Sequence, residues 1–151
     1  LKARFVIVGA PDYGNLASIS KKQLETWVAD GIVEWWGVRE DMPKVLSESF
    51  IVILPSYREG FPKILMEASA CGRPIITTDF PGCRDSIIPN ETGLLIPPKD
   101  TLILAKELRI LLTDRSKCEY MGYRGRLLAE NFYDLREVVD KHFKIYEDLI
   151  N

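Results

Sequence analysis

"FIVILPSYREGFPKILMEASACGRPIITTD", residues 50–79, contains the pattern of a strand, a turn, a helix and a second strand. The apolar runs at 50–56 and 74–79 have the length of strands and end in Ser and Asp. Between them we expect a helix that begins with Pro62, because its missing N–H costs nothing at a first helical position, and that ends before Gly72, which suits a left-handed cap. This alternation predicts buried parallel strands.

The same alternation extends in both directions along the chain. Further apolar runs of strand length lie at 4–10, 33–37 and 93–98, and helical patterns lie at 16–31 and 41–49. After Pro98 the pattern changes to helices only, at 100–114, 115–132 and 135–150. The predicted fold is α/β, a doubly wound, Rossmann-like and mostly parallel sheet flanked by helices. We expect the last three helices to cover one side of the sheet and its edge.

The composition predicts a single domain over residues 1–151. The 151 residues are 46% hydrophobic and 28% charged, which is typical of a folded protein with one core. The net charge of −2 provides no basic field for a phosphate polymer, so nucleic acid is not an expected partner. No run of about 18 apolar residues occurs, and the sequence predicts no membrane span.

The cysteines and the histidine carry no expected chemistry. Cys71, Cys83 and Cys118 form no C-x-x-C pair, which disfavours a disulfide framework or a zinc site and favours a reducing, cytoplasmic location. His142 lies in an apolar-periodic stretch and is interpreted as a packed or partly exposed helical residue. The sequon "NET" at 90–92 is interpreted as the turn before the last strand.

Two glutamates flank the turn after the strand at 50–56. In open α/β sheets ligands gather beyond the carboxyl ends of the strands, which is where this turn falls. The free backbone N–H groups within 60–65, which Pro62 lacks, would point out of the helix start and bind phosphate. Glu59 and Glu67 are then suited to accept hydrogen bonds from the hydroxyl groups of sugars. Spacing alone leaves an alternative, in which Glu59 is a solvated loop charge and Glu67 a helix-favouring surface residue.

Three linked motifs follow one another in residues 59–100: E-x7-E, A-x-G-x-P, and N-x-x-G with two hydrophobic residues after it. Their positions are Glu59 and Glu67; Ala70, Gly72 and Pro74; and Asn90, Gly93, Leu94 and Leu95. Together with "VIVGAPD" (6–12), "VEWWGVRED" (33–41) and "SESFIVILPS" (47–56), they resemble the retaining glycosyltransferases of the GT-B fold, family four. The resemblance covers nearly the whole chain. It implies the C-terminal half of a GT-B fold, which binds a nucleotide-diphosphate sugar.

The resemblance implies a role for each matching residue. Glu59 would be the catalytic-site carboxylate that faces the transferred sugar, and Glu67 would hold the ribose hydroxyls. The nucleobase would lie against the loop at 37–40. The implied donor-binding residues are Gly37, Val38, Arg39, Gly60, Phe61, Pro62, Lys63, Ile64, Leu65 and Glu67. The backbone amides among them would contact sugar and diphosphate, and Lys63 is either an extra diphosphate neighbour or a plain solvated charge.

The chain departs from the family pattern at two places. Many members have a Gly-Gly pair followed by a glutamate where this chain has "PGCRDS" at 81–86, with Cys83 and Asp85, which leaves the role of this loop open. The family's arginine and lysine for the diphosphate belong to a first strand–helix unit that we expect upstream of Leu1, together with an N-terminal acceptor domain. We therefore expect weak donor binding and no transfer activity from this chain alone.

The expected reaction is glycosyl transfer with retention of the anomeric configuration. The sequence has no D-x-D pair, so no metal is expected, and the leaving-group charge would be met by the helix dipole, backbone amides and basic side chains. The resemblance implies same-face attack in which the leaving phosphate takes the acceptor's proton. No cofactor is expected. The first candidate for the donor is a UDP-sugar and the second is a GDP-sugar.

The resemblance further implies a bacterial enzyme of surface polysaccharide, either capsule or lipopolysaccharide. A carbohydrate or lipid-linked acceptor would bind through the missing domain, and contact with the inner membrane face would belong to the full-length protein. Two alternatives stay open. One is a sugar-nucleotide epimerase of similar architecture, for which more acid, base and histidine residues would be expected; the other is a non-catalytic Rossmann-like binding domain.

Overall fold

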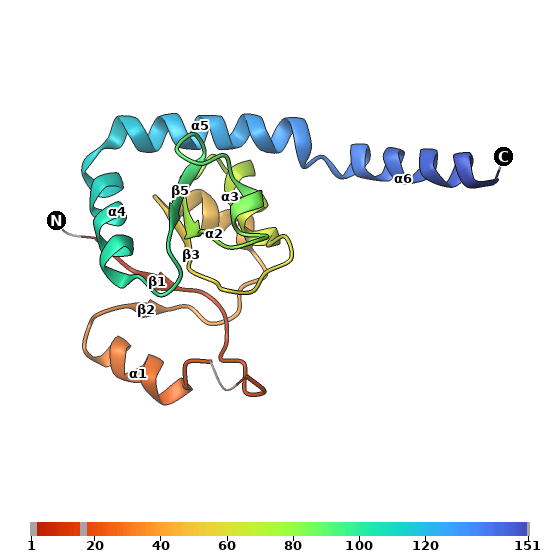
Figure 1. Ribbon diagram of the computed structural model, residues 1–151. Coiled ribbons are helices and arrows are strands. Elements are labelled where there is room, and N and C mark those ends of the chain that lie inside the picture. The colour runs from red at the N-terminus through yellow and green to blue at the C-terminus, as the bar shows by residue number, and fades with distance from the viewer. Residues whose placement is uncertain (1–2, 16–17, 151) are drawn as a thin grey trace. The chain divides into compact units, whose positions relative to one another are not determined.

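The computed structural model describes residues 3–15 and 18–150, and Figure 1 shows the elements. Contacts within the chain divide it into two compact units, Leu1–Met42 and Pro43–Asn151. The first two residues of the helical pattern at 16–31 lie outside the described residues. The expectation of a single domain over 1–151 stays a prediction.

The first unit contains one strand–helix–strand segment. The strands β1 (Val6–Ile7) and β2 (Glu34–Trp35) pair in parallel, with Val6 opposite Glu34. Between them, α1 (Lys21–Ala29) begins where the Ser20 hydroxyl accepts a hydrogen bond from the N–H of Gln23 at 3.2 Å. Both strands lie inside the predicted apolar runs, and the regular pairing covers only part of each run.

The second unit is built on a three-stranded parallel sheet. Its strands are β3 (Val52–Leu54), β4 (Ile75–Thr78) and β5 (Gly93–Ile96), in the order β3-β4-β5. In the registers, Val52 lies opposite Ile75 and Ile75 opposite Gly93. All four residues of the central strand β4 are buried. A central strand covered on both faces explains its continuous run of β-branched residues, and the prediction of parallel strands is confirmed.

Helices follow the strands as the sequence predicts. They are α2 (Met42–Glu48), α3 (Lys63–Ala70), α4 (Thr101–Thr113), α5 (Arg115–Phe132) and α6 (Leu135–Ile150), with a short 3-10 helix η1 at Arg84–Ser86. Asp100 caps α4 by accepting from the N–H of Ile103 at 2.9 Å, and Asp114 caps α5 by accepting from the N–H of Lys117 at 2.9 Å. The sequon at 90–92 forms the turn before β5, where Asn90 has a φ of 64°.

A large part of the core of the second unit is formed by the sheet and the helices α4 and α5. One cluster of six buried residues lies there, namely Ile76, Leu94, Ile96, Leu111, Cys118 and Met121. Further buried apolar residues of this unit lie on α2, α3 and β4, among them Leu46, Leu65 and Ile75. Full burial of one such aliphatic side chain stabilises the fold by about 1.5–3 kcal/mol. The Cys118 thiol donates a hydrogen bond to the carbonyl of Leu111 at 3.1 Å, and burial raises its pKa. Cys83 is also buried, whereas Cys71, the C-cap of α3, is partly exposed.

Gly122 allows α5 to pack against the end of α3. A Cβ added at Gly122 would overlap the carbonyl oxygen of Gly72, so the two backbones touch at this point. One turn further along α5, a Cβ added at Gly125 would lie at ordinary contact distance, 3.5 Å from the Cα of Ser69. The crossing of α3 and α5 therefore depends on the missing side chain of Gly122, and it fixes the helix that carries Glu67.

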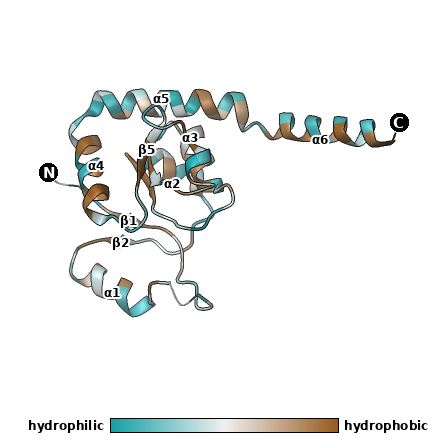
Figure 2. Ribbon diagram, viewed as in Figure 1, coloured by the Kyte–Doolittle hydropathy of each residue, from teal (hydrophilic) through white to brown (hydrophobic). Residues whose placement is uncertain are grey.

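The last helix differs from the prediction. No residue of α6 is buried, so the expectation that 135–150 covers the sheet is wrong. The helix is nevertheless amphipathic, as Figure 2 shows. The spacing of apolar residues predicts such a face, but it does not predict which other element packs against it. The exposed large apolar residues of α6 are Leu135, Val138, Val139, Phe143, Ile145, Tyr146, Leu149 and Ile150. Among the described residues, no helix has both the length and the apolar content needed to cross a membrane.

Candidate functional site

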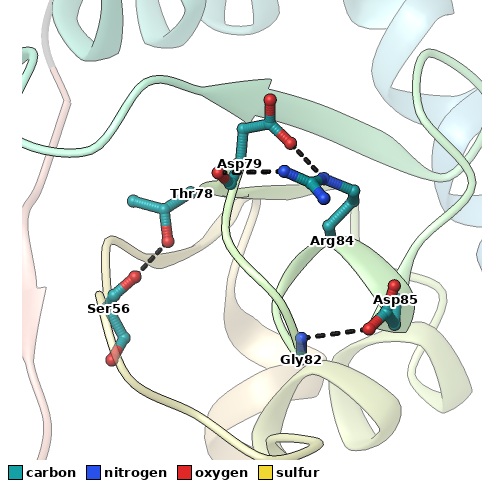
Figure 3. Close-up of polar contacts among 6 residues, drawn as sticks. All are labelled: Ser56, Thr78, Asp79, Gly82, Arg84 and Asp85. Atoms are coloured by element: carbon teal, nitrogen blue, oxygen red, sulfur yellow. Dashed lines mark hydrogen bonds and ion pairs between the residues drawn. The ribbon is translucent and has the colours of Figure 1, made fainter.

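The turn after β3 begins at a fixed position, because two hydroxyl groups of β4 hold its carbonyls. Thr77 Oγ1 donates to the carbonyl of Leu54 at 2.8 Å. Thr78 Oγ1 donates to the carbonyl of Ser56, and Figure 3 shows this second hydrogen bond. Both threonines are fully buried. A buried hydroxyl paired with a carbonyl holds both groups in place, since separating them would leave two unsatisfied polar atoms. The turn therefore starts from a rigid strand end.

A second loop, residues 79–86, packs directly on this turn. Gly82 has a φ of 83°, and a Cβ at this position would overlap the carbonyl oxygens of Glu59 and Gly60. Only glycine can both adopt this positive φ and leave room for the two carbonyl oxygens. The role that the sequence left open for "PGCRDS" is thus a structural one in part, since this loop contacts the backbone of the predicted site. The Pro81–Gly82 dipeptide is the sequence signal that could have indicated a close turn.

Side chains of this second loop hold its own conformation. The Asp85 carboxylate accepts a hydrogen bond from the N–H of Gly82 at 3.1 Å. Ser86 Oγ donates to the carbonyl of Gly82 at 2.6 Å. Arg84 forms an ion pair with Asp79. Figure 3 shows this ion pair and the contact between Asp85 and Gly82. Asp85 therefore stabilises the loop from within.

The turn itself places Glu59, Gly60 and Phe61 at the surface of the second unit. Glu59 is half-buried, while Gly60 and Phe61 are exposed. The Phe61 ring meets Tyr133 edge to face, with ring centroids 5.8 Å apart and an interplanar angle of 77°. Burial raises the pKa of Tyr133, whose hydroxyl donates to the carbonyl of Ser86 at 3.1 Å. Sequence reasoning did not identify Tyr133, because nothing in its spacing connects it to the turn.

The helix start differs by one residue from the prediction. Pro62 is the N-cap, with an extended ψ of 116°, and α3 begins at Lys63. The carbonyl of Pro62 accepts from the N–H of Leu65 at 3.0 Å, so the prediction of a free Leu65 amide is wrong. Pro62 supplies no side-chain hydrogen bond to the first turn. The N–H groups of Lys63 and Ile64 therefore lie at an uncapped, electropositive helix end.

Glu67 lies one turn further along α3, next to Lys63. The Lys63 Nζ and Glu67 Oε1 atoms are 3.1 Å apart, and the side chains are 82% and 30% exposed. Such an exposed i,i+4 pair contributes only about 0.3–0.5 kcal/mol, so a ligand can displace it easily. The structure thus brings two predicted site residues together. The pair is compatible both with a hydroxyl-binding carboxylate and with the alternative of a plain surface charge.

The residues predicted to receive the nucleobase belong to the first unit. Gly37 has a φ of 65°, and its carbonyl accepts from the N–H of Gly9 at 2.7 Å. Val38 is exposed, and the Arg39 guanidinium donates to both carboxylate oxygens of Asp41 at 2.8 and 2.6 Å. Residues 59–67 belong to the second unit. The expectation that the loop at 37–40 and residues 59–67 bind the same ligand stays a prediction.

Within the part of the chain that the structure describes, no group of three or more His, Cys, Asp or Glu residues could hold a metal ion. The arrangement at residues 59–67 offers backbone N–H groups at a helix end, one lysine and two carboxylates. Such a set can bind an anion and hydroxyl groups side by side. It is chemically suited to a phosphorylated sugar.

Comparison with known proteins gives a family match and related enzymes. The family model described as "Glycosyl transferases group 1" matches residues 1–114. An N,N'-diacetylbacillosaminyl-diphospho-undecaprenol alpha-1,3-N-acetylgalactosaminyltransferase of Campylobacter jejuni is 32% identical over 150 residues, 99% of this chain and 38% of the relative. The capsular polysaccharide biosynthesis glycosyltransferase CapM of Staphylococcus aureus is 29% identical over 100 residues, 66% of this chain and 26% of the relative.

A solved structure has the same fold. HepE of Anabaena, in complex with UDP, superimposes with a TM-score of 0.81 and 23% identity, over 97% of this chain and 40% of that protein. The predicted fold class is confirmed. The chain spans less than half the length of each of these proteins.

Proposed function

Because the chain belongs to the group 1 glycosyl transferases, we propose that it is the donor-binding half of a retaining, metal-independent glycosyltransferase. The donor would be a nucleotide-diphosphate sugar, with UDP as the first candidate nucleotide and GDP as the second. The UDP complex of the similarly folded HepE supports this order. The chain alone would bind the donor but transfer no sugar.

The observation that carries this proposal is the rigid turn in front of an uncapped helix. Thr77, Thr78 and Gly82 fix the backbone of residues 54–60, so the amides of Gly60 and Phe61 are held in one arrangement before a ligand arrives. Preorganised N–H donors of this kind stabilise charge that develops on a leaving group. The end of α3 adds its N–H groups and the positive end of its dipole.

Each residue has a proposed task in this reaction. Glu59 orients the hydroxyl groups of the transferred sugar, and Glu67 accepts hydrogen bonds from the ribose, at about 1.5–3 kcal/mol for a charge-assisted bond. Gly60, Phe61 and Ile64 donate their N–H groups to the sugar and diphosphate, and Lys63 neutralises part of the phosphate charge. The departing phosphate accepts the proton of the incoming hydroxyl on the same face of the sugar.

The acceptor is proposed from the relatives. The name of the Campylobacter enzyme gives an undecaprenol-diphosphate-linked sugar as its acceptor, and CapM is named for capsular polysaccharide. We infer a carbohydrate or lipid-linked acceptor in bacterial surface polysaccharide synthesis, bound by parts of the protein other than this chain. The full-length enzyme would then work in the cytoplasm, at the inner face of the membrane when its acceptor is lipid-linked.

The first test is an amide-resolved titration of the chain with UDP, GDP and their sugars. We expect the largest changes at the N–H groups of Gly60, Phe61 and Ile64, with weak affinity. Glu67→Ala should weaken binding of UDP by about tenfold or more, because it removes a charge-assisted hydrogen bond. Glu119→Ala is the matched control, since Glu119 also pairs with a basic residue one turn away, Arg115.

Two results would contradict the proposal. Unchanged amide resonances near residues 60–67 at millimolar nucleotide would exclude a donor site there. Equal UDP affinities of Glu67→Ala and the unsubstituted chain would support the non-catalytic alternative, in which this glutamate is only a surface charge.

A further inference from the structure

One side chain from the end of α5 touches both loops of the candidate site. Tyr133, the C-cap of α5, meets the ring of Phe61 edge to face, and its hydroxyl donates to the carbonyl of Ser86 at 3.1 Å. Phe61 belongs to the turn after β3, and Ser86 closes the loop at 79–86. Tyr133 therefore joins two segments that approach the site from different strands.

These contacts form a closed circuit. Ser86 Oγ donates to the carbonyl of Gly82 at 2.6 Å, and Gly82 lies against the carbonyls of Glu59 and Gly60. Gly60 precedes Phe61, which returns to Tyr133. A closed circuit restricts both loops more than an open chain of contacts does, because no member can move without displacing two others. Tyr133 is the member contributed by neither loop.

We propose that Tyr133 is a positioning residue that holds the Gly60 and Phe61 amides in the orientation that receives the donor. This inference rests on the proposed function of the turn. The hydroxyl acts on the carbonyl of Ser86 and the ring acts on Phe61, so Tyr133 needs no contact with the donor itself. Burial raises the pKa of Tyr133, and the phenol therefore stays a hydrogen-bond donor at neutral pH.

Two substitutions separate the hydroxyl from the ring. Tyr133→Phe removes the hydrogen bond to Ser86 and keeps the ring, whereas Tyr133→Leu removes both contacts. Tyr123→Phe and Tyr123→Leu are matched controls, because Tyr123 lies on the same helix and is 64% exposed. Circular dichroism and thermal unfolding set a temperature at which all variants are folded, so that a loss of stability cannot imitate a loss of binding.

The first measurement needs no ligand. In the amide spectra of the free chain, Tyr133→Phe should shift the resonances of Gly82, Gly60 and Phe61 and speed their hydrogen exchange, while Tyr123→Phe should leave them unchanged. In the second measurement, UDP titration, we expect about threefold weaker binding for Tyr133→Phe and about tenfold weaker binding for Tyr133→Leu. The smaller loss in Tyr133→Phe is the partial rescue expected when the ring is kept.

The outcomes distinguish this inference from the proposed function. If the unsubstituted chain binds UDP and a folded Tyr133→Leu variant binds it equally well, with the Gly60 and Phe61 resonances in place, the positioning role is overturned and the donor site stands. If the unsubstituted chain shows no binding of UDP, GDP or their sugars, the donor site is overturned and the positioning role with it.

Discussion

Gly82 shows how one residue decides the shape of the candidate site. Its backbone angle lies in the left-handed region, and the carbonyls of Glu59 and Gly60 occupy the space where a side chain would begin. The sequence motif at this position could be recognised as a variant of a family pattern, yet its contact with the turn could not be predicted. The contact joins residues far apart in the chain, and a local sequence pattern cannot indicate that such residues lie close together in the fold.

Gly82→Ala is therefore expected to destabilise the second unit. The left-handed φ and the overlap with backbone atoms together should cost about 3 kcal/mol or more, measured as the free energy of unfolding in urea. Gly60→Ala is the control in the neighbouring loop, because a Cβ at Gly60 meets nothing within 4 Å. Equal stabilities of the two variants would contradict the packing described for Gly82.

Glu34 provides a pH-dependent test in the first unit. Arg4 donates two hydrogen bonds to its carboxylate at 2.7 and 2.9 Å and Trp36 donates a third at 3.1 Å, and these lower the pKa of Glu34 to about 2. A lowered pKa in the folded state means that the stabilisation is complete above the ordinary pKa of 4.5 and is lost as the pH falls toward about 2.

Arg4→Gln should raise the pKa of Glu34 toward its ordinary value, followed by the carboxyl carbon resonance during an acid titration. Trp36→Phe should raise it less, because the hydrogen bond from Arg4 is the largest cause of the shift and that from Trp36 the second. A Glu34 resonance that titrates at the same pH in both variants and in the unsubstituted chain would show that neither hydrogen bond persists in solution.

At the scale of elements, the sequence predicts the strands and helices well, since their signals are local. Apolar runs located β3, β4 and β5, and apolar residues three or four positions apart located α4 and α5. The predicted start of α3 at Pro62 was wrong by one residue, because a proline fits either the first helical position or the position before it. Glu59 and Glu67 could be selected as candidates from spacing, but Tyr133 became visible only through the fold.

The crossing of α3 and α5 makes a prediction about elements. Gly122→Ala should destabilise the chain by about 3 kcal/mol or more, because its Cβ would overlap the backbone of Gly72 and push the helices apart. Gly125→Ala, on the same helix, meets only ordinary contacts and should be neutral or stabilising by about 0.5–1 kcal/mol through helix propensity. Chemical denaturation of both variants measures the difference, and a reversed order would refute the crossing.

At the scale of the whole molecule, α6 differs from the other helices in its burial. It buries no residue and exposes a row of large apolar side chains, such as Phe143 and Leu149. A chain that ends at Asp134 should therefore keep nearly the same free energy of unfolding as the full chain. The full chain should associate with rising concentration in light scattering, and the shortened chain should not. A large loss of stability on shortening would show that α6 is packed in solution.

The unequal burial of the three thiols has a practical consequence. Cys83 and Cys118 are enclosed, whereas Cys71 at the end of α3 is partly open to solvent. A maleimide fluorophore should therefore attach at Cys71 before the other two, in the native chain and without any engineered cysteine. The dye would report from the end of the helix that carries Glu67, so nucleotide screening by emission changes becomes feasible without any change of sequence.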